Sequence, residues 1–237
     1  MERNTVKLLG FNLDTFTIDE ALEYIIKHHG QVVTINPEMI QSAQKNDEFA
    51  QIIKNAELVI PDGVGVELGL MILGTRVRRI AGIEFARRLI DRFSENSEPI
   101  AFVGAKPEII QKAVENLKKE TPSLNVCYSQ DGYFKDDERV LEELRNSGAK
   151  LVLVALGSPK QEFFIEKAKR LLPEAVLIGI GGSFDVWSGA VSRAPVIYQK
   201  LCIEWLYRTL KEPKRFKRIF PTLPMFVIKV LQEKFGV

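Results

Sequence analysis

The stretch that most constrains the fold is an uninterrupted apolar run, Ala175 to Ile180, which ends in Gly181-Gly182-Ser183. A run of this length with β-branched residues is typical of a strand covered on both faces, as in a parallel sheet. Glycines at its end let a ligand approach the backbone, and successive N–H groups there can bind an anion. Asp185 and Trp187 follow directly. This loop is therefore either the start of a ligand site or a tight turn into the next element.

Strand-like and helix-like segments alternate through most of the remaining chain. Strands are expected at residues 6–13 (a short strand or a hairpin), 31–35, 58–60, 99–103, 125–129 and 151–155. Helices are expected at residues 17–28, 37–43, 49–55, 66–73, 83–93, 108–119, 136–145 and 162–171. This alternation predicts βαβ units and an α/β fold with a doubly wound, mostly parallel, Rossmann-like sheet.

The pattern changes near residue 195, after which no further strand is evident. We expect residues 1–195 to form the α/β body and residues 196–237 to form a helical C-terminal appendage. From Arg193 onward the chain has ten Lys or Arg and three acids, a net charge of +7, against −5 for the preceding residues of a chain whose total is +2. Apolar residues such as Trp205 and Phe216 are interleaved with these cations. This composition favours a helix lying in a membrane interface, or else a solvated basic face; nucleic acid is not expected as a partner, because no nucleic-acid motif accompanies the charge.

The composition excludes several other classes of protein. Hydrophobic residues make up 46% and charged residues 27% of the 237 residues, which is sufficient for a folded core. Cys127 and Cys202 are the only cysteines, so neither a disulfide framework nor a cysteine-rich metal site is expected. The N-terminus has no apolar signal region, and no apolar run approaches the ~20 residues that a spanning helix needs. We therefore expect a cytoplasmic protein.

Five of the expected strands end in glycine or proline together with polar residues. These ends contain Thr34 and Asn36, Asp62 and Gly63, Gly104, residues 157–161, and residues 181–185. Because the carboxyl ends of parallel strands lie at one edge of a sheet, these residues are expected to converge on one pocket.

Each polar residue of this set has two interpretations. Asp62 is either a turn former or a general base that takes a proton from a hydroxyl. Thr34 and Asn36 either hydrogen-bond a substrate or only finish a strand. Gln161 either adds a donor to the N-terminal field of a helix, which favours phosphate, or is an ordinary first-turn residue.

Common cofactor and metal patterns are absent from the sequence. Residues 179–184 lack the third glycine of the dinucleotide fingerprint, and no phosphate-binding loop ending in Gly-Lys-Ser/Thr occurs. No pair of carboxylates and no His/Asp cluster has the spacing that holds a divalent ion. We therefore expect neither a cofactor nor a metal, and we expect Arg, Lys, amides and helix ends to meet the charge of a leaving phosphate.

Seven motifs occur in order along the chain, at residues 34–39, 61–65, 157–162, 181–185, 193–195, 204–208 and 212–215. Together they closely resemble the WecG/TagA/CpsF glycosyltransferases, and the resemblance covers essentially the whole chain. It implies transfer of a sugar from a UDP-sugar to undecaprenyl-diphosphate-linked N-acetylglucosamine, by an enzyme attached peripherally to the cytoplasmic face of the membrane. The members nearest in pattern use UDP-N-acetylmannosamine, invert the anomeric centre and need no metal, whereas others use N-acetylmannosaminuronate, glucose or galactose. A non-enzymatic module that binds nucleotide sugars or lipid phosphates is the competing class, and a homo-oligomer remains open.

The resemblance also implies roles for individual residues. Asp62 corresponds to the general base, Thr34 to its neighbour in the catalytic pocket, and Gln161 to a residue near the diphosphate. Tyr133 and Asp185 correspond to nucleoside contacts. The basic residues that face the phosphates correspond to Arg79 in the body and to Arg208, Arg215 and Arg218 in the appendage, where Lys214 and Lys217 could exchange roles with the arginines. The other substrate-binding positions are expected to be Asn36, Gly63, Gly104, Gly132, Gly157, Gly181 and Gly182.

Overall fold

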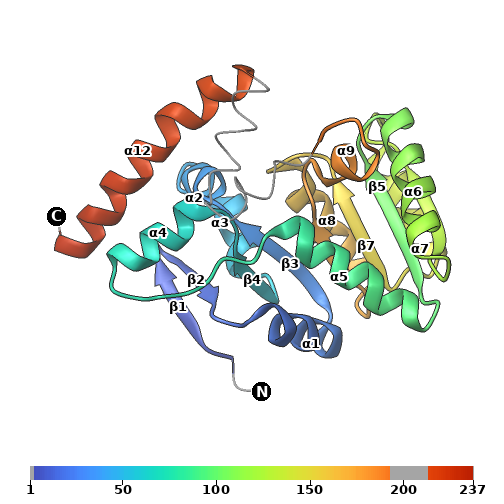
Figure 1. Cartoon of the computed structure of the whole chain (residues 1–237), viewed down its shortest axis with the longest axis horizontal. Helices are drawn as coiled ribbons and strands as arrows, with labels where there is room; N and C mark the ends of the chain where they lie inside the picture. Colours follow the sequence, from blue (N-terminus) through green and yellow to red (C-terminus); the bar gives the residue numbers. More distant parts are fainter. Residues whose placement is uncertain (1–2, 193–212, 237) are drawn as a thin grey trace.

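The computed structural model describes residues 3–192 and 213–236, and its centre is a six-stranded sheet (Figure 1). The strands are β3 (Gly30–Ile35), β4 (Leu58–Pro61), β5 (Pro99–Gly104), β6 (Asn125–Gln130), β7 (Leu151–Ala155) and β8 (Val176–Gly179). They lie in the order β4-β3-β8-β7-β5-β6, and every pairing between them is parallel. The prediction of a doubly wound, mostly parallel α/β sheet is confirmed.

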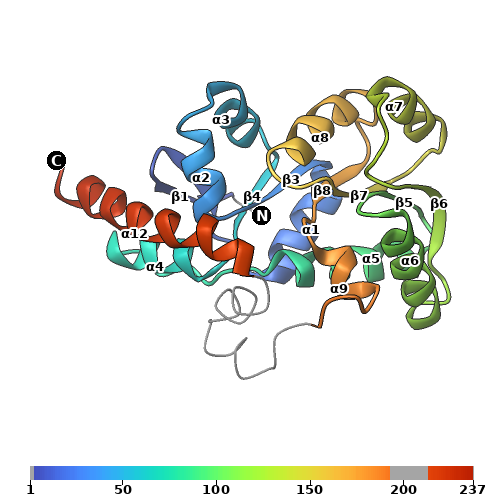
Figure 2. The ribbon, with the colours of Figure 1, turned by 90° about the horizontal axis from the view of Figure 1, so that it is seen from above.

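Two layers of helices enclose the sheet (Figure 2). One layer contains α1 (Ile18–His28), α5 (Gly82–Glu95) and α6 (Pro107–Glu120), and the other contains α2 (Pro37–Ala43), α3 (Asp47–Lys54), α7 (Asp137–Asn146) and α8 (Lys160–Leu171). Successive strand residues serve opposite layers, since side chains alternate across a strand. Leu151 and Leu153 of β7 pack in the cluster of α5, whereas Val152 and Val154 pack in the cluster of α7 and α8.

A separate antiparallel hairpin, β1 (Thr5–Leu8) and β2 (Phe11–Asp14), packs beside the edge strand β4, as one of the two sequence interpretations predicts. Asp14 at the end of β2 is fully buried. One of its carboxylate oxygens accepts a hydrogen bond from the Val59 N–H at 2.8 Å, and Arg3 binds both oxygens at 2.6 and 3.1 Å. The carboxylate thereby satisfies a backbone donor that an edge strand would otherwise expose.

Local capping residues explain where several helices begin. The capping box predicted at the start of α1 is present, since Thr17 and Glu20 each accept a hydrogen bond from the other's backbone N–H. Asn36 caps α2, where Pro37 occupies the first turn, and Asn46 caps α3. The short helix α9 (Ser183–Trp187), directly after the glycine loop, was not predicted.

The last described helix, α12 (Pro213–Phe235), lies across α2 and α4 (Val64–Ile72) (Figure 1). Its Phe226 and Val230 are buried in the same cluster as Val66 and Leu70 of α4. Close contact with α4 depends on glycine, because a Cβ at Gly69 would lie 3.1 Å from the Phe226 ring.

Polar contacts complete the attachment of α12: Gln41 donates to the Thr222 carbonyl, Lys229 donates to Gln44, and Glu233 accepts from the Leu9 N–H. A helix is thus present where the sequence predicts a helical appendage. Arg208 and the side chains of Arg215 and Arg218 lie outside the described part of the chain, as does the boundary near residue 195.

Candidate active site

The carboxyl edge of the sheet contains a topological switch point between β5 and β7. These strands are neighbours, yet β5 leads into α6 on one face of the sheet and β7 leads into α8 on the other. Loops that leave adjacent strands in opposite directions open a crevice at the carboxyl ends, where α/β proteins bind ligands. Apart from Arg79, the predicted site residues of the body follow β3, β4, β5, β6, β7 and β8, or lie at their ends, so the structure brings them to this one edge.

Polar side chains gather where β3 and β4 end. Thr34 and Asp62 are half-buried, and the backbone N–H of Asp62 donates to the Ile35 carbonyl at 2.8 Å. The Thr34 side chain lies against the start of α5, because a Cβ at Gly82 would stand 3.2–3.3 Å from its atoms. Thr34 and Asp62 therefore lie on neighbouring strand ends, as a shared catalytic pocket requires.

Arg79 reaches the same corner through the connector between α4 and α5. Its neighbour Ile80 donates a backbone hydrogen bond to the Pro61 carbonyl at 2.8 Å, which fixes the connector beside the end of β4. Arg79 is half-buried, as is Gly63, whose φ of +80° suits glycine. Asn36 lies here too, but its side-chain oxygen caps α2 by accepting from the Met39 N–H at 3.0 Å. Its amide nitrogen, and the second lone pair of its oxygen, can then bind a substrate.

The ends of β5 and β7 meet through backbone atoms. Gly104 has a φ of +122°, and a Cβ there would stand 2.3 Å from the Ala155 carbonyl oxygen, so only glycine fits. Ala105 donates to that same carbonyl at 3.0 Å, and its own carbonyl accepts from the Gly132 N–H at 2.8 Å. Gly104 and Gly132 thus allow three loops to pack together at the crevice.

The loop after β6 presents an aromatic ring. Tyr133 is 68% exposed, and its backbone N–H donates to the Asp131 carboxylate at 2.8 Å. In the loop after β8, the Asp185 carboxylate lies 3.5 Å from the position that a Cβ on Gly182 would occupy. Helix α9, which contains Asp185, is tied to α6 because the Asn116 amide donates to the Trp187 carbonyl at 2.9 Å. These positions allow the predicted nucleoside contacts.

Gln161 differs from the predicted picture of a residue available to phosphate. Its side chain is only 5% exposed and lies across the end of β8, where a Cβ at Gly179 would be 2.4 Å from its amide nitrogen. The Gln161 oxygen accepts from the Gly181 N–H at 3.3 Å, and its nitrogen donates to Glu162 at 2.8 Å. Gln161 therefore supports the glycine loop from below.

Sequence reasoning did not single out Glu162. This side chain is 3% exposed, and burial raises the pKa of its carboxyl above the ordinary value of 4.5. The available signal was a charged residue among the apolar positions of an amphipathic helix, next to Gln161.

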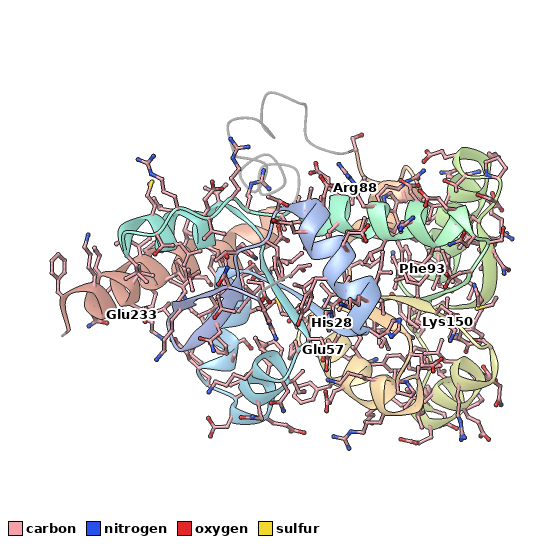
Figure 3. The ribbon with its side chains drawn as sticks, turned by 90° about the horizontal axis from the view of Figure 1, so that it is seen from below. His28, Glu57, Arg88, Phe93, Lys150 and Glu233 are labelled. Carbon is pink, nitrogen blue, oxygen red and sulfur yellow. The ribbon has the colours of Figure 1, made fainter. Side chains whose placement is uncertain are left out.

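One surface hollow adjoins the loop of Tyr133, whose N–H donates to Asp131, and another lies at the opposite edge of the sheet. The first, of about 360 Å³, lies beside α6 and β6 and includes Ile110 and Asp131. The other, of about 290 Å³, lies at the amino edge of the sheet, where Phe93 and Lys150 border it (Figure 3). Neither hollow includes a predicted catalytic residue.

Neither a metal-binding cluster nor a membrane-spanning helix occurs in the described part of the chain. Within residues 3–192 and 213–236, no group of three or more His, Cys, Asp or Glu side chains is arranged to hold a metal ion. Over the same residues, no helix combines the length and the hydropathy that crossing a membrane requires. Whether the reaction depends on a metal stays a prediction.

The fold and its polar carboxyl edge define an α/β protein of the class that binds ligands at the ends of parallel strands. The family model described as "Glycosyl transferase WecG/TagA/CpsF family" matches residues 6–237. The chain belongs to this family, and it is therefore a glycosyltransferase. The competing interpretation as a non-enzymatic binding module is set aside.

Two similar relatives are both named N-acetylglucosaminyldiphosphoundecaprenol N-acetyl-beta-D-mannosaminyltransferase. The protein from Bacillus spizizenii (strain W23) is 34% identical over 233 residues, which cover 98% of this chain and 90% of the relative. The protein from Bacillus subtilis (strain 168) is 33% identical over 238 residues, which cover 98% of this chain and 91% of the relative. The similarity therefore extends over nearly the full length of this chain and of each relative.

Proposed function

We propose that the protein transfers N-acetylmannosamine from UDP-N-acetylmannosamine to undecaprenyl-diphosphate-linked N-acetylglucosamine, as in the linkage unit of wall teichoic acid. The main support for this proposal is that two relatives, 33–34% identical over 98% of the chain, are named for this activity. The gathering of Thr34, Asp62 and Arg79 at one corner of the carboxyl edge supports it.

In the proposed mechanism, transfer takes one displacement with inversion. The Asp62 carboxylate accepts the proton of the acceptor hydroxyl, whose oxygen bonds to the anomeric carbon while the bond to the UDP oxygen breaks. UDP leaves with the electron pair of that bond, and its added negative charge needs cations and N–H donors. Arg79 in the body and Arg208, Arg215 and Arg218 in the appendage are proposed to supply the cations.

The proposed donor position places uridine beside Tyr133 and Asp185. An exposed tyrosine ring offers a flat face for the base, and a carboxylate can accept hydrogen bonds from ribose hydroxyls. The diphosphate then lies between this end and Asp62, over the glycine loops after β7 and β8. Thr34 is proposed to hold the sugar or the acceptor hydroxyl next to Asp62, and its position beside the start of α5 supports this role.

The proposed attachment to the cytoplasmic membrane face rests on α12. Four of its apolar side chains are exposed, namely Met225, Ile228, Leu231 and Phe235, while Phe226 and Val230 face the body. The exposed residues recur every three or four positions, so they share one side of the helix. A helix that is apolar on the side facing away from the protein, and basic in sequence at its start, suits a lipid interface.

The test is a reconstituted reaction with a short-chain lipid-diphosphate N-acetylglucosamine acceptor. Purified protein is given UDP-N-acetylmannosamine, and the product is identified by mass spectrometry and by NMR of the anomeric proton. UDP-glucose, UDP-galactose and UDP-N-acetylmannosaminuronate are supplied in parallel. We expect transfer from UDP-N-acetylmannosamine with inversion. Faster transfer from another donor would replace the proposed sugar, and retention of configuration would contradict a single displacement.

A further inference from the structure

Glu162 occupies an unusual position for a carboxyl group in the first turn of α8. Its side chain is 3% exposed, and one carboxyl oxygen accepts from the Gln161 amide nitrogen at 2.8 Å. The other oxygen is buried and has no hydrogen-bond partner of ordinary geometry among the described residues. Weaker interactions with the Ser158 side chain and with the backbone of Glu162 itself lower the pKa of the carboxyl but do not offset the effect of its burial. A carboxyl group that is buried and only half satisfied destabilises the fold relative to an apolar side chain of similar size. Its presence therefore calls for a role that an apolar residue could not fill.

That role follows from the symmetry of the Gln161 amide. The oxygen and the NH₂ group of a glutamine occupy nearly the same space, so a half-turn of the amide exchanges acceptor and donor. In Gln161 the oxygen faces the Gly181 N–H, which can only donate. The nitrogen faces Glu162, whose oxygen accepts. A flipped amide would oppose donor to donor at Gly181, and Glu162 holds the NH₂ group away from that position.

The next link is the glycine loop itself. Gly181 has a φ of +49°, and Gly182 then caps α9, which contains Asp185. Two side-chain contacts fix where this loop leaves β8: the Gly181 N–H donates to the Gln161 oxygen at 3.3 Å, and the Ser183 hydroxyl donates to the Ile180 carbonyl at 2.7 Å. No Cβ interferes, because Gly179 leaves room for the amide.

We propose that Glu162 is a positioning residue. By orienting the Gln161 amide, it holds the Gly181-Gly182 loop in the shape that binds the UDP-sugar. The inference rests on the proposed donor position at this loop. Glu162 itself is buried below the loop and touches no substrate. Glu162 must supply an oxygen that accepts a hydrogen bond from the Gln161 NH₂ group, and a negative charge on that oxygen is not required.

The test compares two substitutions of Glu162 with a matched control on the same helix. Glu162→Met keeps the volume but removes the acceptor, whereas Glu162→Gln keeps an acceptor oxygen. Glu166→Gln, one turn further along α8, removes a carboxylate that pairs with Lys169 and Arg170 away from the site. For Glu162→Met we expect kcat/KM for the UDP-sugar to fall ~10- to ~100-fold, since small misplacements of binding groups cost that much. Its melting temperature should stay equal or rise, because a half-satisfied buried carboxyl is removed.

Glu162→Gln should keep kcat/KM within about threefold of the wild type, as should Glu166→Gln, because both leave the acceptor in place. Equal losses in Glu162→Gln and Glu162→Met would overturn the inference, since charge and not orientation would then matter. Full activity in Glu162→Met would overturn it as well.

A second readout does not depend on catalysis. Amide hydrogen exchange at Gly181 should accelerate in Glu162→Met and stay unchanged in Glu162→Gln. The Ile180 amide, which donates to the Val154 carbonyl at 2.8 Å, is the internal control. Unchanged Gly181 protection in Glu162→Met would refute the positioning role whatever the activity. If Glu162→Met loses protection at Gly181 as expected, but the wild type transfers no sugar from any UDP-sugar, then the proposed function is wrong and the positioning of the loop by Glu162 is still supported.

Discussion

The two halves of the candidate site differ in how far they rely on side chains and on the backbone. At the ends of β3 and β4 the site presents side chains, Thr34, Asp62 and Arg79, on a frame of ordinary backbone hydrogen bonds. At the ends of β5, β7 and β8 the site relies more on backbone, with Gly104 and Gly181 at positive φ and with loops bonded to one another, and it adds the Asp185 side chain. A side chain can be replaced while its frame survives, whereas a glycine that permits close packing is part of the frame itself.

This difference predicts how each half responds to substitution. Changes in the β3–β4 half should alter chemistry and leave stability nearly intact. Substitutions in the β5–β7–β8 half should lower stability, and they should lower activity only as a consequence of that loss.

The largest effect is expected from Asp62→Asn, in the side-chain half. Turnover should fall by ~100-fold or more while UDP binding and the melting temperature stay nearly unchanged, because a general base acts in the transition state. Steady-state kinetics, calorimetric titration with UDP and thermal melting measure the three quantities. Asp137→Asn on α7 is the control, since it removes a surface carboxylate away from the site. A parallel loss of UDP binding and stability would make Asp62 a structural residue and would erase the contrast between the halves.

The next effect belongs to the backbone half, where Gly104→Ala and Gly157→Ala form a matched pair. Both glycines have positive φ, but a Cβ at Gly104 would meet the Ala155 carbonyl at 2.3 Å and a Cβ at Gly157 would meet nothing within 4 Å. We expect Gly104→Ala to lower the free energy of unfolding by ~3 kcal/mol or more, and Gly157→Ala by ~1 kcal/mol, the ordinary cost of a left-handed alanine. Urea denaturation measures both. Similar costs at the two positions would mean that backbone contact does not set the geometry of this half.

A smaller effect is expected from pH, through the buried carboxyl that supports the backbone half. Burial raises the pKa of Glu162 above 4.5, so the folded state holds its proton to higher pH than the unfolded state does. Stability should therefore decline as pH rises from about 4.5 through the raised pKa, where the buried group must ionise. Glu162→Gln should remove this decline in urea titrations at a series of pH values. An identical pH dependence in the two proteins would show that Glu162 ionises freely.

The smallest expected effect is none, after treatment with a chelator. If Arg side chains and N–H groups meet the charge of UDP, then EDTA should leave the initial rate unchanged. If EDTA abolishes activity and Mg²⁺ or Mn²⁺ restores it, a metal ion takes part in the reaction and the metal-free mechanism is wrong.

Local patterns were sufficient to predict most elements but not their arrangement. The capping box at Thr17 and the apolar run at Ala175 are readable within a few residues, and α1 and β8 form there. That β3 pairs with β8, joining Val32 to Ile178, depends on packing between distant segments and leaves no local trace. Gathering the site residues at one edge was predictable because parallel strands share their carboxyl ends.

The sequence did not reveal which polar residues are buried, such as Gln161 in the site and Asp14 in the β1–β2 hairpin outside it. A polar residue is expected to face solvent or a ligand, because burying it without a partner is costly. Both are buried because specific partners, the Gly181 N–H and the Val59 N–H, lie beside them in the fold. Such partners are set by three-dimensional neighbours and not by spacing along the chain.

The packing of α12 also bears on the order in which the protein folds. Phe226 and Val230 share one buried cluster with Leu8, so this part of the core joins segments that are far apart in the sequence. Contacts between distant segments form late, because closing a long loop costs conformational entropy before the contacts stabilise it. We therefore expect the Gly65 and Gly69 side of α4 to be covered by α12 only in the last stage of folding.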